Sequence, residues 1–133
     1  HSTFVTDHKN GVYEFTPPSV SSGTFGVGVL RAIENNPILS EIPGLEEIVA
    51  FLDVLMQLSS LPPDVSASDI VYTNNWVHGF GVMEVTPEAL YTKIYQIPNE
   101  YVGTSYYADP EALDELVEVL EFTVMDGVLE QLR

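Results

Sequence analysis

Three histidines and two nearby acids are the side chains of this sequence best suited to chemistry. His1 opens the chain, Asp7 and His8 are adjacent, and Glu14 stands in a short strand-forming run. Neutral imidazole is a common metal ligand. Two interpretations therefore stand for His1: a metal ligand, or a terminal residue without a role, such as the remnant of a purification tag.

The acids near His1 also have two interpretations each. Asp7 either orients the imidazole of His1, as carboxylates do for many ligating histidines, or caps a turn. Glu14 either faces solvent or belongs to a buried polar network near a metal. For His8, in a polar turn, and His78, at a strand entrance, we expect structural roles. No His-Glu-x-x-His pattern occurs that would place two ligands on a helix.

Several other chemistries are excluded by missing motifs. Ser19, Ser21 and Ser22 are not part of a Gly-x-Ser-x-Gly nucleophile elbow. The glycines between residues 23 and 28 follow no dinucleotide or phosphate-loop pattern. An EF-hand loop is absent. The chain has no cysteine, which excludes disulfides and thiol chemistry.

The charge balance limits the partners. Twenty acids against four bases give a formal net charge of −16. Nucleic acids and anionic membranes are excluded, because binding them requires Lys and Arg. Strong acidity suits calcium and a salt-rich medium, where screening reduces self-repulsion. We expect a secreted or periplasmic protein, although no signal peptide is visible.

The length and the hydrophobic content predict a packed structure. The chain has 133 residues, 45% of them hydrophobic, which fits one domain or a piece of a larger one. No apolar run reaches membrane-spanning length. The first residue is His1 and not a methionine, so we expect the chain to be processed or part of a longer protein.

Periodicity predicts helices and antiparallel strands, hence an α+β fold. The expected strands are 12–16, 70–72, 80–85 and 90–97, the last two joined as a hairpin through Thr86-Pro87-Glu88. The expected helices are 25–36, 45–56 and an acidic amphipathic helix over 109–133, begun by Asp109-Pro110. The acids of this tail are expected on a solvated helix face.

Three segments in order carry a family resemblance. They are His-Ser-Thr-Phe-Val-Thr-Asp at 1–7, Tyr-Glu-Phe-Thr-Pro-Pro-Ser-Val-Ser-Ser at 13–22, and Gly-Phe-Gly-Val-Met-Glu-Val-Thr-Pro-Glu at 79–88. Together they resemble the C-terminal part of PhoD-like phosphatases, in the metallophosphoesterase superfamily. The first segment corresponds to the family's Gly-Asp-x-His motif, of which only the histidine, His1, is present. Residues 1–108 would form this part, with 25–68 as a helical insertion, while the tail from 109 matches nothing in the family.

The resemblance implies a fold and an activity. The fold would be a two-layer sheet sandwich, mainly antiparallel, with flanking helices and a metal cluster at the strand ends. The cluster would contain calcium and iron, with His1 as one ligand and most other ligands on an N-terminal portion or a separate chain. Phe4, Tyr13 and Trp76 would wall the pocket. The complete enzyme would hydrolyse phosphomonoesters or phosphodiesters, and this chain alone would be inactive.

A second interpretation comes from another class of protein. The same apolar helix faces that suit an insertion also suit a structural or interaction module without chemistry, which would pair with a larger partner chain. Both interpretations remain open at the level of the sequence.

Overall fold

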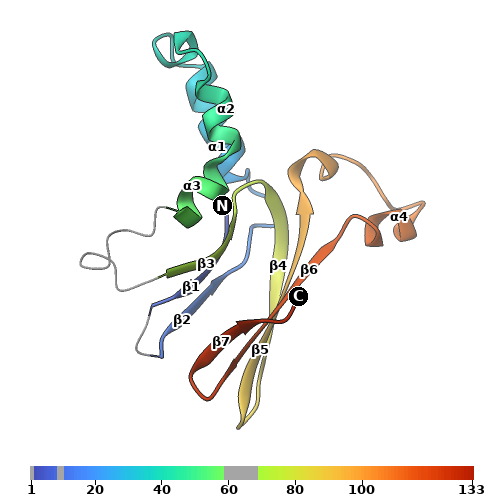
Figure 1. Ribbon diagram of the computed structural model, residues 1–133. Coiled ribbons are helices and arrows are strands. Elements are labelled where there is room, and N and C mark those ends of the chain that lie inside the picture. The colour runs from blue at the N-terminus through green and yellow to red at the C-terminus, as the bar shows by residue number, and fades with distance from the viewer. Residues whose placement is uncertain (1, 9–10, 59–68) are drawn as a thin grey trace.

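The chain forms two antiparallel sheets that pack face to face (Figure 1), in a computed structural model that describes residues 2–8, 11–58 and 69–133. The first sheet has the order β2-β1-β3 and the second β4-β5-β6-β7. The strands are β1 (Thr3–Asp7), β2 (Tyr13–Thr16), β3 (Asp69–Asn74), β4 (Val77–Val85), β5 (Ala89–Pro98), β6 (Glu118–Met125) and β7 (Val128–Gln131). The expected α+β class with antiparallel sheets is confirmed.

The core lies between the two sheets. Val5 of β1 packs with Ile94 of β5 and with Leu120 and Phe122 of β6. The Phe122 ring contacts two aromatic rings of the opposite sheet, Phe15 at 6.0 Å and Tyr72 at 6.5 Å between centroids. Because strands alternate their side chains between two faces, one face of each sheet supplies this core.

The hairpin of β4 and β5 agrees with the prediction from the sequence. Val85 pairs with Leu90, and the register continues to Val77 opposite Pro98. The Thr86 amide donates to the Ala89 carbonyl at 2.9 Å and closes the turn. The strand predicted at 12–16 is also present, as β2.

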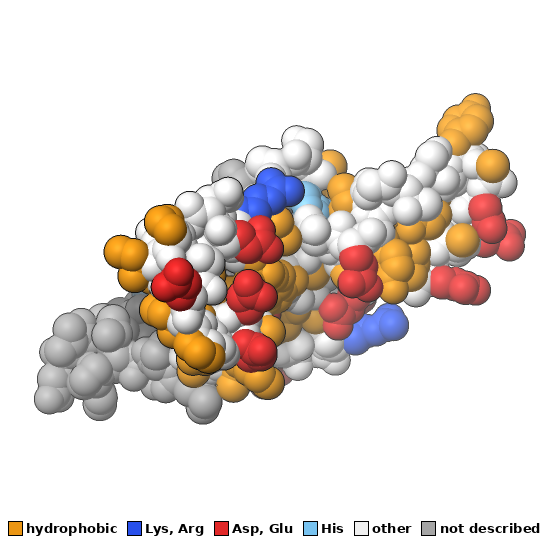
Figure 2. Space-filling model, turned by 90° about the horizontal axis from the view of Figure 1, so that it is seen from above, with side chains coloured by type: hydrophobic (Ala, Val, Ile, Leu, Met, Phe, Trp, Pro, Cys, Tyr) orange, Lys and Arg blue, Asp and Glu red, His pale blue; other side chains and the backbone are white. Residues whose placement is uncertain are grey.

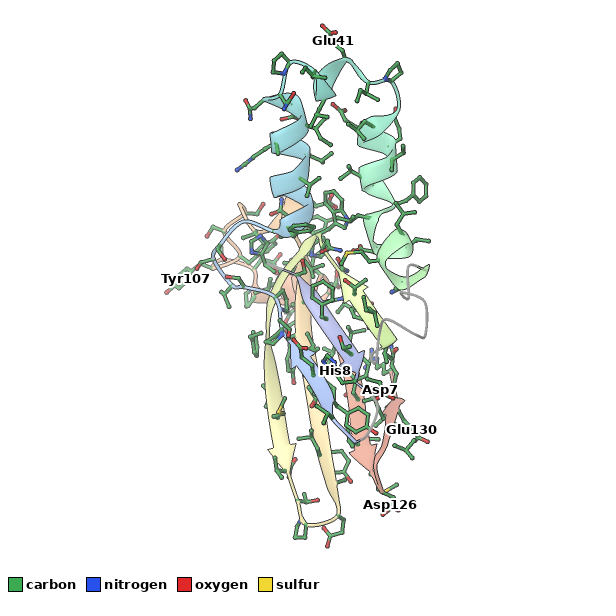
Figure 3. The ribbon with its side chains drawn as sticks, turned by 90° about the vertical axis from the view of Figure 1, so that its left-hand side faces the viewer. Asp7, His8, Glu41, Tyr107, Asp126 and Glu130 are labelled. Carbon is green, nitrogen blue, oxygen red and sulfur yellow. The ribbon has the colours of Figure 1, made fainter. Side chains whose placement is uncertain are left out.

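Three helices project from one end of the sandwich and form what we call the helical arm, residues 25–58 (Figures 1 and 3). It comprises α1 (Phe25–Glu34), the 3₁₀ turn η1 (Leu39–Glu41), α2 (Leu45–Ala50) and α3 (Leu52–Leu58). The helix predicted over 45–56 is therefore divided, at Phe51. α3 packs against β3, and α1 against α2. The remainder of the predicted insertion, 59–68, lies outside the described residues. No helix among the described residues is long and apolar enough to cross a membrane.

The predicted tail helix over 109–133 is wrong. Asp109 does cap a helix, its carboxylate accepting from the Ala112 amide at 3.2 Å, but α4 (Pro110–Asp114) ends after little more than one turn. The remaining tail forms β6 and β7, because β5 offers a complete edge and Leu120 and Phe122 alternate into the core. Asp126 and Gly127, with φ of 51° and 72°, make the connecting turn.

Candidate functional site

The end of the sandwich beneath the helical arm contains a buried polar network. Ser2, just before β1, is 8% exposed and donates its hydroxyl to the Asn75 side-chain oxygen. Thr3 is fully buried and donates to Gln96 Oε1 at 3.4 Å. The chain therefore enters β1 through two hydrogen-bonded side chains, and their burial fixes its position.

Asn75 is the centre of this network. It is fully buried, in the connection between β3 and β4, and its main-chain amide donates to Asp53 Oδ1 at 2.9 Å. Its side-chain amide donates to the same oxygen. The main-chain carbonyl of Asn75 accepts from the Gly26 amide at 2.9 Å. A buried amide with all these partners is stable, whereas one without them would be costly. Asn75 thus joins the start of β1 to α1 and α3 of the arm.

A second group of polar side chains lies between the sheets at the same end. Gln96 is 1% exposed, and its amide donates to the Tyr72 hydroxyl at 2.7 Å and to Glu118 Oε2 at 2.6 Å. Burial raises the pKa of the Tyr72 phenol, an effect only partly offset by the Gln96 hydrogen bond. Tyr72 is therefore a neutral phenol at physiological pH.

Thr24 lies close to the network, at the start of α1. Two residues later, Gly26 packs so tightly against Trp76 that a Cβ on Gly26 would lie 2.7 Å from the indole ring. Thr24 is 3% exposed, and its hydroxyl has no hydrogen-bond partner among the described residues. The hydroxyls of Thr24, Thr73 and Thr92 are the buried ones that the described residues do not satisfy.

Of the residues predicted from the sequence, Asp7, His8 and Glu14 lie together on the β1–β2 hairpin. His1 lies outside the described residues, so its metal-ligand role stays a prediction. Asp7 ends β1 at the opposite end from Ser2 (Figure 3). At roughly 3.3 Å per strand residue, about 16 Å separates them, so the arrangement gives no support to a hydrogen bond from Asp7 to His1. The role of Asp7 otherwise stays a prediction.

Glu14 faces solvent, as one of its two interpretations stated. It accepts from the Thr16 hydroxyl at 2.8 Å and pairs with His8 Nε2 at 2.9 Å, with 53% of its side chain exposed. The His8 hydrogen bond, more than any other interaction, lowers the pKa of Glu14. Tyr13, beside them, donates its hydroxyl to the Gly127 carbonyl. The Glu14–His8 pair therefore stabilises the β1–β2 hairpin, far from the polar network.

His78 is buried and structural. Its Nδ1 lies 3.1 Å from the Ser19 carbonyl oxygen and its Nε2 2.8 Å from the Asn99 side chain. The ring thus joins the loop after β2 to the end of β5, and both its nitrogens are occupied.

The described residues do not by themselves provide a metal centre. Over residues 2–8, 11–58 and 69–133, no group of three or more His, Asp or Glu side chains is placed to hold a metal ion. Asp53, the carboxylate nearest the start of β1 in the network, already accepts two hydrogen bonds from Asn75.

Comparisons with protein-family models, with curated proteins and with solved structures give no match to this chain. The network itself was not predicted. Two signals in the sequence point to it: Asp53 interrupts the apolar run of a helix, and Gln96 ends the buried alternation of Leu90, Thr92 and Ile94. Polar residues at positions of apolar periodicity are either satisfied in the core or functional.

Proposed function

We propose that this chain is the C-terminal portion of a PhoD-like metal-dependent phosphatase, which hydrolyses phosphomonoesters or phosphodiesters. The observation that carries the proposal is the order of three family segments, at 1–7, 13–22 and 79–88. Their places in the fold support it. The first runs through the central strand β1, the second begins with its neighbour β2, and the third lies in β4 of the facing sheet.

In this proposal the polar network positions the metal ligand. Ser2 and Asn75 fix the start of β1, so the main chain that leads to His1 has a defined position. His1 would be one ligand of a cluster of calcium and iron, completed by an N-terminal portion or a second chain. Such metals lower the pKa of a bound water and neutralise charge on the phosphoryl oxygens. The chain's own contribution is to hold the end of the strand rigidly.

The test uses the protein with all sequence that precedes His1. Hydrolysis of 4-nitrophenyl phosphate and of bis(4-nitrophenyl) phosphate is measured with added calcium and iron, and again after chelation. We expect metal-dependent hydrolysis that His1→Ala lowers at least about 100-fold, since loss of an outer partner alone costs up to that much. His8→Ala is the matched control and should retain activity. Hydrolysis that survives chelation, or equal effects of the two variants, would contradict the proposal.

One observation favours the second candidate, a non-catalytic module that pairs with a larger chain. The helical arm exposes large apolar side chains, which are Ile38 at 74%, Phe51 at 62%, Ile48 at 56% and Val54 at 49%. Figure 2 shows acidic side chains distributed among apolar ones on the side of the molecule seen from above. An extensive exposed apolar surface with a polar rim is typical of protein interfaces. A stable complex with a partner and no hydrolysis of either ester would favour this candidate.

A further inference from the structure

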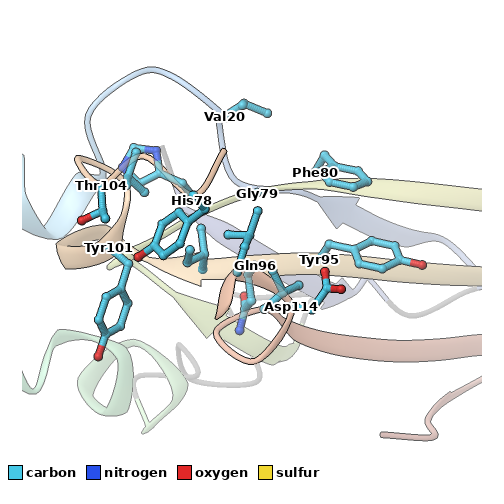
Figure 4. Close-up of a pocket in the computed structure, with 14 residues that line it drawn as sticks. Val20, His78, Gly79, Phe80, Tyr95, Gln96, Tyr101, Thr104 and Asp114 are labelled. Atoms are coloured by element: carbon cyan, nitrogen blue, oxygen red, sulfur yellow. The ribbon is translucent and has the colours of Figure 1, made fainter. Parts of the chain in front are cut away.

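A groove of about 470 Å³ lies beside the second sheet and shares Gln96 with the polar network (Figure 4). Its walls come from the start of β4, the end of β5, and the segment from η2 (Asn99–Tyr101) to Val117. The volume falls within the range of small-molecule sites. Aromatic and aliphatic side chains share the lining, with Phe80 and Tyr95 at one end of the view and Tyr101 at the other.

Four aromatic residues contribute to the lining of the groove. Phe80 and Tyr95 stack on each other with centroids 5.0 Å apart and an interplanar angle of 14°, and Phe80 remains 52% exposed. Tyr106 joins Tyr101 on the opposite wall. The face of an aromatic ring is electron-rich and attracts cations, with the largest effect where water is partly excluded.

The electrostatics of the groove favour a positive ligand. Asp114 lines it, and no Lys or Arg among the described residues does. Lys93, on the strand that carries Tyr95, is neutralised by Glu121 at 2.9 Å. Glu100 raises the pKa of the Tyr101 phenol, first through a hydrogen bond and then through its negative charge. The chain's formal charge of −16 adds to this field and repels anions.

Two polar residues of the lining, His78 and Gln96, already have hydrogen-bond partners. His78 contacts the Ser19 carbonyl and Asn99 through its two ring nitrogens. Gln96 donates both to Tyr72 and to Glu118. The single carboxylate of Asp114 is therefore the strongest recognition group that the groove offers.

We propose that this groove binds an organic ammonium group, held over the aromatic rings and paired with Asp114. Quaternary and methylated ammonium ions suit such a site, since they are weakly hydrated and aromatic cages recognise them. The proposal does not depend on phosphatase activity, because the groove and the polar network around Ser2 share only Gln96 among the described residues.

The experiment compares two ligands of the same shape. Choline and 3,3-dimethylbutan-1-ol differ only in the replacement of the charged nitrogen by carbon. Each is titrated into the full chain and followed by two-dimensional amide NMR, together with Asp114→Asn and a control, Asp126→Asn. Asp126 lies in the β6–β7 turn, so the control removes the same net charge outside the groove. Asp114 is exposed, so its replacement leaves the amide spectrum of the fold intact.

We expect choline to shift the amides of β4, β5 and segment 99–117 and to bind at least about tenfold more tightly than the neutral alcohol. Asp114→Asn should lower choline affinity several-fold without affecting the alcohol, and Asp126→Asn should have no effect. Equal binding of the two ligands, no binding of choline, or equal effects of the two variants would overturn the proposal.

Discussion

The sheet sandwich and the helical arm differ in how completely they cover their apolar residues. In the sandwich, Ile94 and Phe122 are each 1% exposed. On the arm, Ile38 is 74% and Phe51 62% exposed. The chain's own packing therefore covers the interior between the sheets, whereas the described residues leave much of the arm uncovered, as they do the end of β4, where Val85 is 77% exposed. The stability of this chain should come from the sheets, while the arm provides a surface.

The largest expected effect is a loss of core packing. Phe122→Ala removes the ring that contacts Phe15 and Tyr72 across the sheets, and should lower the free energy of unfolding by about 3–5 kcal/mol. Phe51→Ala, the same change on the arm, should alter it by about 0.5 kcal/mol or less. Urea unfolding of the two variants measures both. Comparable losses would mean that the arm is part of the cooperative core.

Two glycines, one in the sandwich and one in the arm, test the same difference between tight and loose packing. A Cβ on Gly79 would lie 1.9 Å from the main-chain oxygen of Tyr95, inside the β4–β5 pairing. Gly79→Ala should therefore cost about 1–3 kcal/mol or more. Gly28, in α1, has no atom within 4 Å of an added Cβ. Gly28→Ala should raise stability by about 0.5–1 kcal/mol, and thermal unfolding of both variants distinguishes the two signs.

The junction between arm and sandwich is the next target. Asn75→Ala removes the side-chain partner of Ser2 and one of the two hydrogen bonds to Asp53, and should cost about 1–3 kcal/mol. Because Asp53 belongs to α3, amide hydrogen exchange should also accelerate in α3 more than in β5 and β6. Asn35→Ala, at the exposed end of α1, is the control and should leave both quantities nearly unchanged. Uniform acceleration over the whole chain would contradict a local role for the junction.

The smallest effect concerns the β1–β2 hairpin. His8 holds the pKa of Glu14 below its ordinary value of 4.5. A carboxyl whose pKa is lower in the folded state stabilises the fold above the unfolded pKa and loses that contribution as the pH falls. Because the pair is exposed, the difference between wild type and Glu14→Gln should be about 0.5 kcal/mol or less at neutral pH. It should shrink below pH 4.5; a difference that grows on acidification would contradict this sign.

Local chemistry made part of the fold predictable. The Thr86-Pro87-Glu88 turn and the alternating residues on either side gave the β4–β5 hairpin, and Asn35-Asn36-Pro37 marked the end of α1. The prediction of a helix in the tail was wrong because the apolar residues there fit both a helical and an alternating pattern. Leu120, Phe122 and Val124 alternate, and Asp126-Gly127 is a strong hairpin signal that the helical stripe obscured.

The candidate site was less predictable, since its parts meet only in three dimensions. Asn75 stands in a turn whose sequence indicates no more than a turn, and its partner Asp53 lies on a helix far along the chain. Asp7 and Glu14 are close to His1 in sequence, yet β1 carries Asp7 to the opposite end of the sheet from Ser2. Asp7 instead lies beside β2, opposite Tyr13, and its predicted role near His1 stays a prediction because His1 lies outside the described residues.

The residues that precede His1 in the encoded protein test the central proposal most directly. Sequencing the gene upstream of this segment, with the intact mass of the purified protein as a check, gives the answer. The account predicts Gly-Asp-x immediately before His1, which would complete the metal-binding motif of a PhoD-like phosphatase. Any other residues at those positions would remove His1 from that motif and contradict the proposed function.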